Sequence, residues 1–416
     1  MTAERIVIIG AGLAGAGAAV ELRERGFAGE VELLGAEPHA PYLRPPLSKG
    51  YLAGDDDRRS FEVKPAAWYA EHDIRLRTGT RAVALDRAAR RVTLADGATL
   101  GYDQLLLATG STPNPLPVPG GELAGVHLLR TVEQADALRA ALADGGRRIV
   151  VIGSGWIGME VAATARTLGN EVTVLMRGEV PLASQLGAEL GEDFARLHEE
   201  HGVVLRAGAH AREVRGEDGS VVGVLLEGGE TLPADVVVAA VGASPAISLA
   251  AEAGLDTGDG VHVDARLRTS DAAIWAAGDI AAVVHPVLQA AGYPARLRSE
   301  HWAYADKTGP HAARSMLGDE TPFDAIPYFY TDQFDLGMEY TGFAQLTRHA
   351  EVVIRGDREA REFVALWVRE GRVLAGMNVN VWDVADEIGR LVRAGSTGHT
   401  VDLARLADPA VPLEEL

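Results

Sequence analysis

Residues 5–15 read RIVIIGAGLAG, an apolar run followed by closely spaced glycines. The run 5–9 is short and rich in β-branched residues, which is typical of a buried parallel strand. Beyond it, AGAAVELRERG (16–26) predicts a helix that ends near Gly26, and VELLG (31–35) predicts a second strand. The chain therefore begins with a strand–turn–helix–strand unit of the α/β class.

The glycines of this turn have the spacing GxGxxG, at Gly10, Gly12 and Gly15. In a dinucleotide-binding turn the first glycine makes the tight bend, the second lets a pyrophosphate approach the backbone, and the third lets helix and strand pack closely. The helix N-terminus, which follows at Leu13 and Ala14, then stabilises the phosphate charge. The alternative is a glycine-rich corner without a ligand.

The same pattern returns later in the chain. Its elements are, in order, the strand RIVVI (148–152), the turn GSGWIG (153–158), the helix MEVAATARTLG (159–169) and the strand EVTVL (171–175). The turn supplies the candidate binding residues Gly153, Gly155, Trp156, Ile157 and Gly158. Two such turns in one chain predict two bound dinucleotides, one in each of two Rossmann-like domains.

The two copies differ where a ribose would be recognised. The first ends in Glu37, whose carboxylate can accept hydrogen bonds from a ribose diol. The second ends in Met176-Arg177-Gly178, without an acid at the tip. An arginine there suits a 2′-phosphate, which favours NADPH over NADH, although a solvent-exposed surface arginine is the alternative.

Composition excludes several classes of function. The 416 residues include 59 acidic and 39 basic side chains, a formal charge of −20, which disfavours nucleic acid and anionic membranes as partners. There is no cysteine, so a disulfide, a thiolate nucleophile and a cysteine-ligated cluster are excluded, and redox chemistry needs a bound cofactor. None of the 12 histidines forms an HxxxH or HExxH pair, and we predict no metal site.

The apolar stretch 6–20 is too short for a membrane span, and its glycines belong to the first turn. We therefore expect a soluble, cytoplasmic protein.

Further motifs occur in a fixed order around the two turns. They are PYLRPPLSKGYL (41–52), YDQLLLATGSTPNPLPVPG (102–120), IWAAGDIAAV (274–283), EHWAYADKTGPHAARSMLG (300–318) and PYFYTDQFDLGMEYTGFA (327–344). Together they resemble the FAD-dependent NAD(P)H:ferredoxin reductases, the reductase components of cytochrome P450 and ring-hydroxylating dioxygenase systems and relatives of apoptosis-inducing factor. The resemblance covers essentially the whole chain.

The resemblance implies an α/β fold in which an FAD domain (1–114 and 246–322) is interrupted by an NAD(P) domain (115–245), with a small α+β C-terminal domain at 323–416. Pro/Gly-rich segments at 111–121 and 242–245 suit the two crossings. In the last domain, REFVALWVRE (361–370) predicts a strand before a turn at Gly371, and DVADEIGRLVRAG (383–395) predicts a helix.

The resemblance also implies roles for individual residues. Lys49 would lie beside the flavin and pair with Glu160, and this pair would order the nicotinamide site; a solvated loop lysine and a helix-surface acid are the alternatives. Asp279 would accept a hydrogen bond from the FAD ribityl chain, or simply cap a helix. Tyr330 departs from the tryptophan common in these reductases, and could also be a core aromatic. The other expected cofactor contacts are Arg44, Pro45, Val83, Ala108, Thr109, Gly110, Arg130, Trp302 and Gly242.

The implied activity is hydride transfer from NAD(P)H to FAD, followed by single-electron transfer to a [2Fe–2S] ferredoxin that serves an oxygenase. A monomer or homodimer is expected, with a basic docking patch drawn from Arg296, Arg298, Lys307 and Arg314. A reductase of a small acceptor such as a quinone, and a nucleotide-responsive flavoprotein like apoptosis-inducing factor, remain as alternatives.

Overall fold

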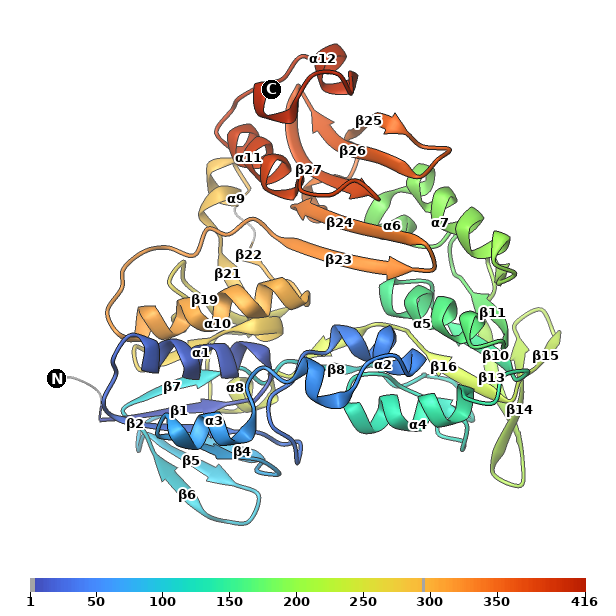
Figure 1. Ribbon diagram of the computed structural model, residues 1–416. Helices are drawn as coiled ribbons and strands as arrows, with labels where there is room; N and C mark the ends of the chain where they lie inside the picture. The colour runs from blue at the N-terminus through green and yellow to red at the C-terminus, as the bar shows by residue number, and fades with distance from the viewer. Residues whose placement is uncertain (1–3, 294–295) are drawn as a thin grey trace.

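The computed structural model describes residues 4–293 and 296–416. Figure 1 shows two α/β lobes side by side, with a third lobe formed by the end of the chain lying across both of them. The fold predicted from the sequence, two Rossmann-like domains and a small C-terminal α+β domain, is confirmed.

The first lobe is built on a five-stranded parallel sheet in the order β20-β7-β1-β2-β3. Its strands are β1 (Arg5–Ile9), β2 (Glu30–Leu34), β3 (Ile74–Arg77), β7 (Gln104–Leu107) and β20 (Ile274–Ala276). Helix α1 (Leu13–Glu24) follows the first glycine turn, as predicted, and packs against α10 (Trp302–Met316). Residues Ile6 to Ile8 of β1 are fully buried, which explains their uninterrupted apolar run.

The second lobe repeats this design with the sheet order β12-β11-β10-β16-β9. Its strands are β9 (Val126–His127), β10 (Arg148–Ile152), β11 (Glu171–Leu175), β12 (Val204–Arg206) and β16 (Val236–Ala239). Its longer helices are α4 (Val132–Leu142), α5 (Trp156–Thr167) and α7 (Ala188–Glu200). Strands β10 and β11 coincide with the predicted runs.

The chain crosses between these lobes twice at one place. There β8 (Ser111–Pro113) and β17 (Ala243–Pro245) pair antiparallel, so the outgoing and returning segments lie side by side.

Three small sheets flank the two lobes. The first contains β4 (Ala82–Asp86), β5 (Arg91–Leu94) and β6 (Thr99–Gly101), and the second contains β13 (Ala211–Glu217), β14 (Ser220–Leu226) and β15 (Thr231–Pro233). The third contains β18 (Thr257–Gly258), β19 (Gly260–Val263), β21 (Ala281–Val284) and β22 (Arg296–Leu297). The short helices are α2 (Gly50–Ala53), α3 (Ala66–Glu71), α6 (Ala183–Leu186), α8 (Ser248–Glu252) and α9 (Pro286–Ala290).

The third lobe is an antiparallel sheet in the order β23-β24-β27-β26-β25. Its elements are β23 (Tyr328–Gln333), β24 (Leu336–Gly342), β25 (Glu351–Asp357), β26 (Glu362–Arg369), β27 (Arg372–Val379), α11 (Ala385–Ser396) and α12 (Leu403–Ala407). The strand and helix predicted from its sequence are confirmed as β26 and α11.

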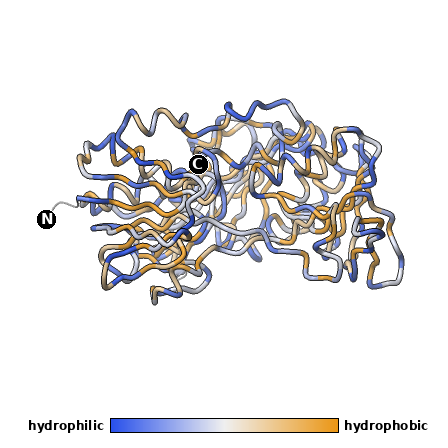
Figure 2. Tube along the Cα trace, turned by 90° about the horizontal axis from the view of Figure 1, so that it is seen from below, coloured by the Kyte–Doolittle hydropathy of each residue, from blue (hydrophilic) through white to orange (hydrophobic). Residues whose placement is uncertain are grey.

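This lobe shares apolar clusters with both others. Val364 and Ile388 belong to the cluster that contains Ile6, whereas Phe363 and Met377 belong to the one that contains Val151. In Figure 2 the hydrophobic segments run through the interior of the molecule and the hydrophilic ones follow its outer loops. Continuous burial of this kind holds the three lobes in one arrangement, in which β23 packs against α10 of the first lobe and α5 of the second. Among the described helices, none is long and apolar enough to cross a bilayer.

Candidate functional site

One cavity opens above the first glycine turn and extends to the third lobe. Most of the predicted cofactor residues line it: Gly10, Gly12, Leu13, Ala14, Glu37, Arg44, Pro45, Lys49, Ala108, Thr109, Gly110, Arg130, Trp156, Ile157, Glu160, Asp279, Trp302 and Tyr330. They come from all three lobes, and the fold brings them together.

The first glycine turn leaves open space at one end of the cavity, beside Gly12. A Cβ on Gly10, which has φ +115°, would lie 2.0 Å from the carbonyl oxygen of Ala108, and one on Gly15 would lie 1.9 Å from the carbonyl oxygen of Gly10. These two glycines are therefore required by close packing. A Cβ on Gly12, by contrast, would meet nothing within 4 Å, although Gly12 is the N-cap of α1. The open space lies at a helix N-terminus, where an anion is stabilised.

The second turn has the same geometry. A Cβ on Gly153 would lie 2.2 Å from the carbonyl oxygen of Ala240, and one on Gly158 would lie 2.2 Å from that of Gly153. Gly155, the N-cap of α5, again faces open space. The two turns thus offer equivalent cradles for two pyrophosphates.

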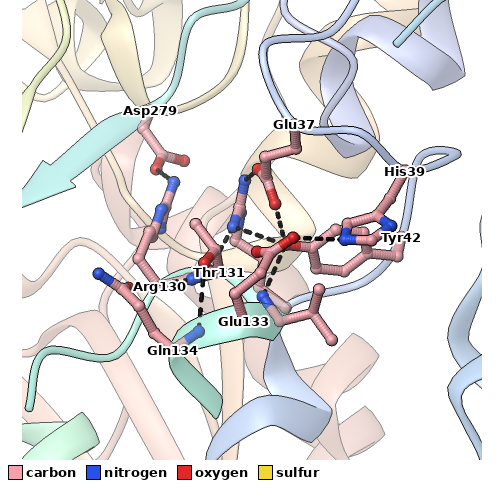
Figure 3. A network of polar contacts seen from close by, with 10 residues as sticks. Glu37, His39, Tyr42, Arg130, Thr131, Glu133, Gln134 and Asp279 are labelled. Carbon is pink, nitrogen blue, oxygen red and sulfur yellow. Dashed lines mark hydrogen bonds and ion pairs between the residues drawn. The ribbon is translucent and has the colours of Figure 1, made fainter. Parts of the chain in front are cut away.

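A network of polar side chains borders the cavity (Figure 3). Glu37 accepts hydrogen bonds from the Tyr42 hydroxyl and from Arg44, whose Nη2 lies 2.7 Å from Oε1 of Glu37. Arg130 Nη2 lies 2.6 Å from Oδ2 of Asp279, an oxygen that also accepts a bond of 3.0 Å from Ser111. Arg44 and Arg130 are therefore both held by carboxylates beside the open floor of the cavity.

The pair expected between Lys49 and Glu160 is present. Lys49 Nζ lies 2.7 Å from Oε2 of Glu160, which is 4% exposed, and 5.6 Å from the centre of the Tyr330 ring. Ser48 and Thr331 donate hydrogen bonds to the same carboxylate. Because Lys49 precedes α2 and Glu160 lies on α5, the pair ties the first lobe to the second at the cavity wall.

Aromatic side chains close the other end of the cavity. The rings of Trp302 and Tyr330 meet edge to face with centroids 6.3 Å apart, and His301 stacks on Phe329 at 4.0 Å. Burial lowers the pKa of His301 to about 4, against the raising effect of Asp279, so this imidazole is neutral near pH 7. The neutral imidazole and the aromatic rings of Phe329, Trp302 and Tyr330 offer flat surfaces suited to a ring system.

Several predicted residues lie outside this cavity. Gly15 and Gly158 are packing positions, and Gly153 and Gly155 form the second turn. Val83, 45% exposed, lines an adjoining cavity that also contains Glu37 and Arg44. Gly242 lies at the crossing, where its carbonyl accepts a hydrogen bond from Asn114, and Arg177 is exposed just after β11.

Other lining residues escaped the sequence analysis, namely His39, Tyr42, Ser111 and Phe329. Tyr42, Ser111 and Phe329 lie within the motifs that carry the family resemblance, but their contacts with Glu37, Asp279 and His301 are visible only in the folded chain.

Three of the four residues expected in the basic docking patch make contacts within the chain, and the fourth, Lys307, is exposed. Arg298 is paired with Asp259 at 3.0 Å and Glu300 at 2.6 Å, and Arg314 with Glu21 at 3.1 Å. Arg296 donates to the carbonyl oxygen of Val263. Most of these partners are distant in sequence and meet the guanidinium groups only through the fold, whereas Glu300 is a near neighbour of Arg298 in the chain.

The residues present fit an FAD. Arg130 Nε and Trp302 Nε1 are buried donors that find no hydrogen-bond partner within residues 4–293 and 296–416, and both residues line the cavity. Buried donors of this kind are costly unless a bound group satisfies them. The open floor at Gly12 suits a pyrophosphate, and the aromatic end suits a ring. Within the residues that the structure describes, no cluster of three or more histidine, aspartate or glutamate side chains could hold a metal ion.

Comparison with known proteins gives a consistent result. Residues 4–309 match the family described as pyridine nucleotide-disulphide oxidoreductase, and residues 328–416 match the reductase C-terminal domain. Rhodocoxin reductase of Rhodococcus erythropolis is 40% identical over 90% of this chain and 86% of its own.

Two solved structures resemble the whole chain. The ferredoxin reductase for the CYP199A2 system from Rhodopseudomonas palustris has a TM-score of 0.91 and 36% identity, with 99% of each chain covered. The reductase in the covalent putidaredoxin reductase–putidaredoxin complex has a TM-score of 0.91 and 34% identity, covering 100% of this chain and 98% of that one.

Proposed function

The chain belongs to the pyridine nucleotide-disulphide oxidoreductase family and carries its reductase C-terminal domain, and from this we propose that it is an FAD-dependent NAD(P)H:ferredoxin reductase of an oxygenase system. The disulphide chemistry in the family's name is unavailable to it, because the chain has no cysteine. Electrons that enter the protein must therefore leave to a separate acceptor. Relatives that cover the chain from end to end are named as reductase components of dioxygenase systems.

The observation that carries the proposal is the Lys49–Glu160 pair at the wall of the cavity. When bound, FAD supplies a hydride acceptor that can afterwards give up electrons one at a time. Lys49 presents a cation where negative charge would develop, and the buried carboxylate of Glu160 holds that cation in place. Trp156 and Ile157, at the start of α5, place the second cradle next to the same cavity, so a nicotinamide can approach from that side.

The acceptor is a [2Fe–2S] ferredoxin in this proposal. Its support is the full-length likeness to a reductase solved in a covalent complex with putidaredoxin. The test is anaerobic flavin reduction with NADPH or NADH, followed by cytochrome c with and without a ferredoxin. Cytochrome reduction that depends on ferredoxin is expected. Rapid turnover indifferent to ferredoxin would point to a small acceptor, and slow reduction with a persistent charge-transfer band to a nucleotide-responsive switch.

We also propose that NADPH is the preferred donor, on the strength of Arg177. Its exposed side chain follows Met176 at the end of β11, and in the described part of the chain it forms no ion pair. Arg206 of β12 lies alongside, since its carbonyl accepts a hydrogen bond from the backbone of Met176. The guanidinium of Arg177 suits the 2′-phosphate of NADPH, whereas that of Arg206 is paired with Glu230 at 2.5 Å.

Replacing Arg177 is expected to reverse this preference. Arg177→Glu removes a charged contact to phosphate and supplies a carboxylate for a ribose diol, so kcat/KM for NADPH should fall about 10- to 100-fold relative to NADH. The same charge change at Arg212, an exposed residue of β13, is the control and should leave the ratio unaltered. Equal losses with both nucleotides in Arg177→Glu would contradict the NADPH proposal. Steady-state kinetics with each nucleotide measures the ratio.

A further inference from the structure

A chain of buried polar side chains runs from the second lobe to the Lys49–Glu160 pair. It starts at His198 on α7, continues through Gln333 and Thr331 on β23, and ends at Glu160 on α5. The exposed fractions are 0% for His198, 1% for Gln333, 1% for Thr331 and 4% for Glu160. Buried polar groups cost stability unless they are hydrogen-bonded, so a continuous chain of this kind is held by its own contacts.

The carboxylate sets the direction of every bond in this chain. An ionised Glu160 can only accept, so the Thr331 hydroxyl, 2.7 Å from Oε1, must donate to it. The amide nitrogen of Gln333 donates to the same hydroxyl oxygen over 3.2 Å, which leaves the amide oxygen facing His198. That oxygen lies 2.8 Å from Nε2 of His198, and the imidazole must therefore donate.

The environment of His198 agrees with this direction. Its buried Nδ1 has no hydrogen-bond partner among the described residues, which agrees with a neutral ring protonated at Nε2. The ring meets Phe334 edge to face at 5.1 Å. Burial lowers the pKa of His198 to about 4, with the Gln333 bond opposing this effect and nearby His201 adding to it. The imidazole thus serves as a fixed donor and not as a proton carrier near pH 7.

We propose that His198, Gln333 and Thr331 are positioning residues, which hold Oε1 of Glu160 so that its other oxygen faces Lys49. The two oxygens have separate tasks: Oε2 meets Lys49 Nζ and Ser48, whereas Oε1 meets only Thr331 among the hydrogen bonds of the described residues. Loss of the Thr331 hydroxyl would leave a buried carboxylate oxygen without a donor, and the carboxylate would be free to turn away from Lys49.

The inference rests on the proposed function, because the rate that it affects is flavin reduction by NADPH. The chain joins the second and third lobes to a residue pair that lies against the first. Glu160 is therefore held from the third lobe as well as by Lys49, and its orientation depends on how β23 is seated.

The test compares Thr331→Val with Thr331→Ser and with Thr341→Val. Thr341 is a matched control, since it is 5% exposed on the neighbouring strand β24 and its hydroxyl has no hydrogen-bond partner in the part of the chain that the structure describes. In single-turnover experiments Thr331→Val should lower the limiting rate of flavin reduction about tenfold, with the apparent Kd for NADPH little changed. Thr331→Ser should restore the rate, and Thr341→Val should match the wild type. If Thr331→Val does not fold, Gln333→Met tests the neighbouring hydrogen bond, and the same loss of flavin-reduction rate is expected.

A second readout does not depend on activity. The ¹⁵N resonances of the His198 imidazole, assigned with His198→Phe, should show the neutral form protonated at Nε2 in the wild type and a shifted Nε2–H signal in Thr331→Val. A Thr331→Val protein with unaltered rate and unaltered His198 resonances would overturn the inference while leaving the reductase assignment intact. A wild type that NADPH does not reduce, but whose His198 signal responds to Thr331→Val, would overturn the function and leave the chain intact.

Discussion

Gly12→Asp is expected to yield a folded protein that holds no flavin. Gly12 has φ −82° and ψ −172°, an extended conformation open to any residue, and a Cβ there would meet nothing within 4 Å. Aspartate is also a good N-cap for α1, so the apoprotein should be as stable as before or more so. Its carboxylate would nevertheless lie where the first pyrophosphate must approach. Like charges at close range cost several kcal/mol, which corresponds to an affinity loss of about 1,000-fold.

The measurement is the flavin absorbance of the purified protein and the Kd for added FAD. Gly155→Asp is the reciprocal variant, because Gly155 is the equally open N-cap of α5; it should retain FAD and lose nicotinamide nucleotide binding. Gly228→Asp, at an open position in the loop between β14 and β15, controls for the added charge and should change neither affinity. Normal flavin content in Gly12→Asp would refute the placement of the pyrophosphate at the first turn.

Lys49→Met should slow flavin reduction by about 100-fold and lower the free energy of unfolding by about 3 kcal/mol. Lys49 has a side chain that is 16% exposed and Glu160 one that is 4% exposed, so removal of the cation leaves a nearly buried carboxylate unpaired. It also removes the positive charge from the place where reduction would build negative charge. Stopped-flow absorbance and denaturant unfolding measure the two effects.

The double variant Lys49→Met/Glu160→Gln separates them. Neutralising the carboxylate removes the unpaired buried charge, so stability should largely return while the rate stays low. Lys64→Met is the control, because Lys64 lies over the ring of Trp68 and is not part of the Lys49–Glu160 pair. Its flavin should be reduced at the wild-type rate. If Lys49→Met reduced normally, the cation would have no part in hydride acceptance.

The recurrent strand–glycine–helix pattern was enough to predict the two parallel sheets. Strand β1 is Arg5–Ile9 and β10 is Arg148–Ile152, the same residues as the predicted runs, because the four residues after each arginine are buried and apolar, as is typical of buried parallel strands. Helix α1 ends at Glu24, two residues before the predicted glycine. Helix ends fray and adapt to tertiary contacts, so such boundaries are the part of a local pattern that is least determined.

The side-chain contacts around the site could be predicted from the sequence only in part. Glu160 and Lys49 were expected to pair only because the chain resembles a known family, and nothing in local spacing joins two residues that far apart. The chain Thr331–Gln333–His198 was not foreseen, since it needs β23 of the third lobe to lie against α5 and α7 of the second. The docking patch stays a prediction: Arg298 and Arg314 look free in the sequence but fold against carboxylates, whereas Lys307 is exposed.

The sequence alone determined the two glycine turns, the absence of thiol chemistry and the parallel sheets, because each depends on residue type and on spacing within one βα unit. Only the tertiary structure decided which charged groups remain available and which oxygen of Glu160 faces Lys49. Those properties depend on side chains brought together from three lobes. Their geometry follows from how apolar faces pack, which no local pattern encodes.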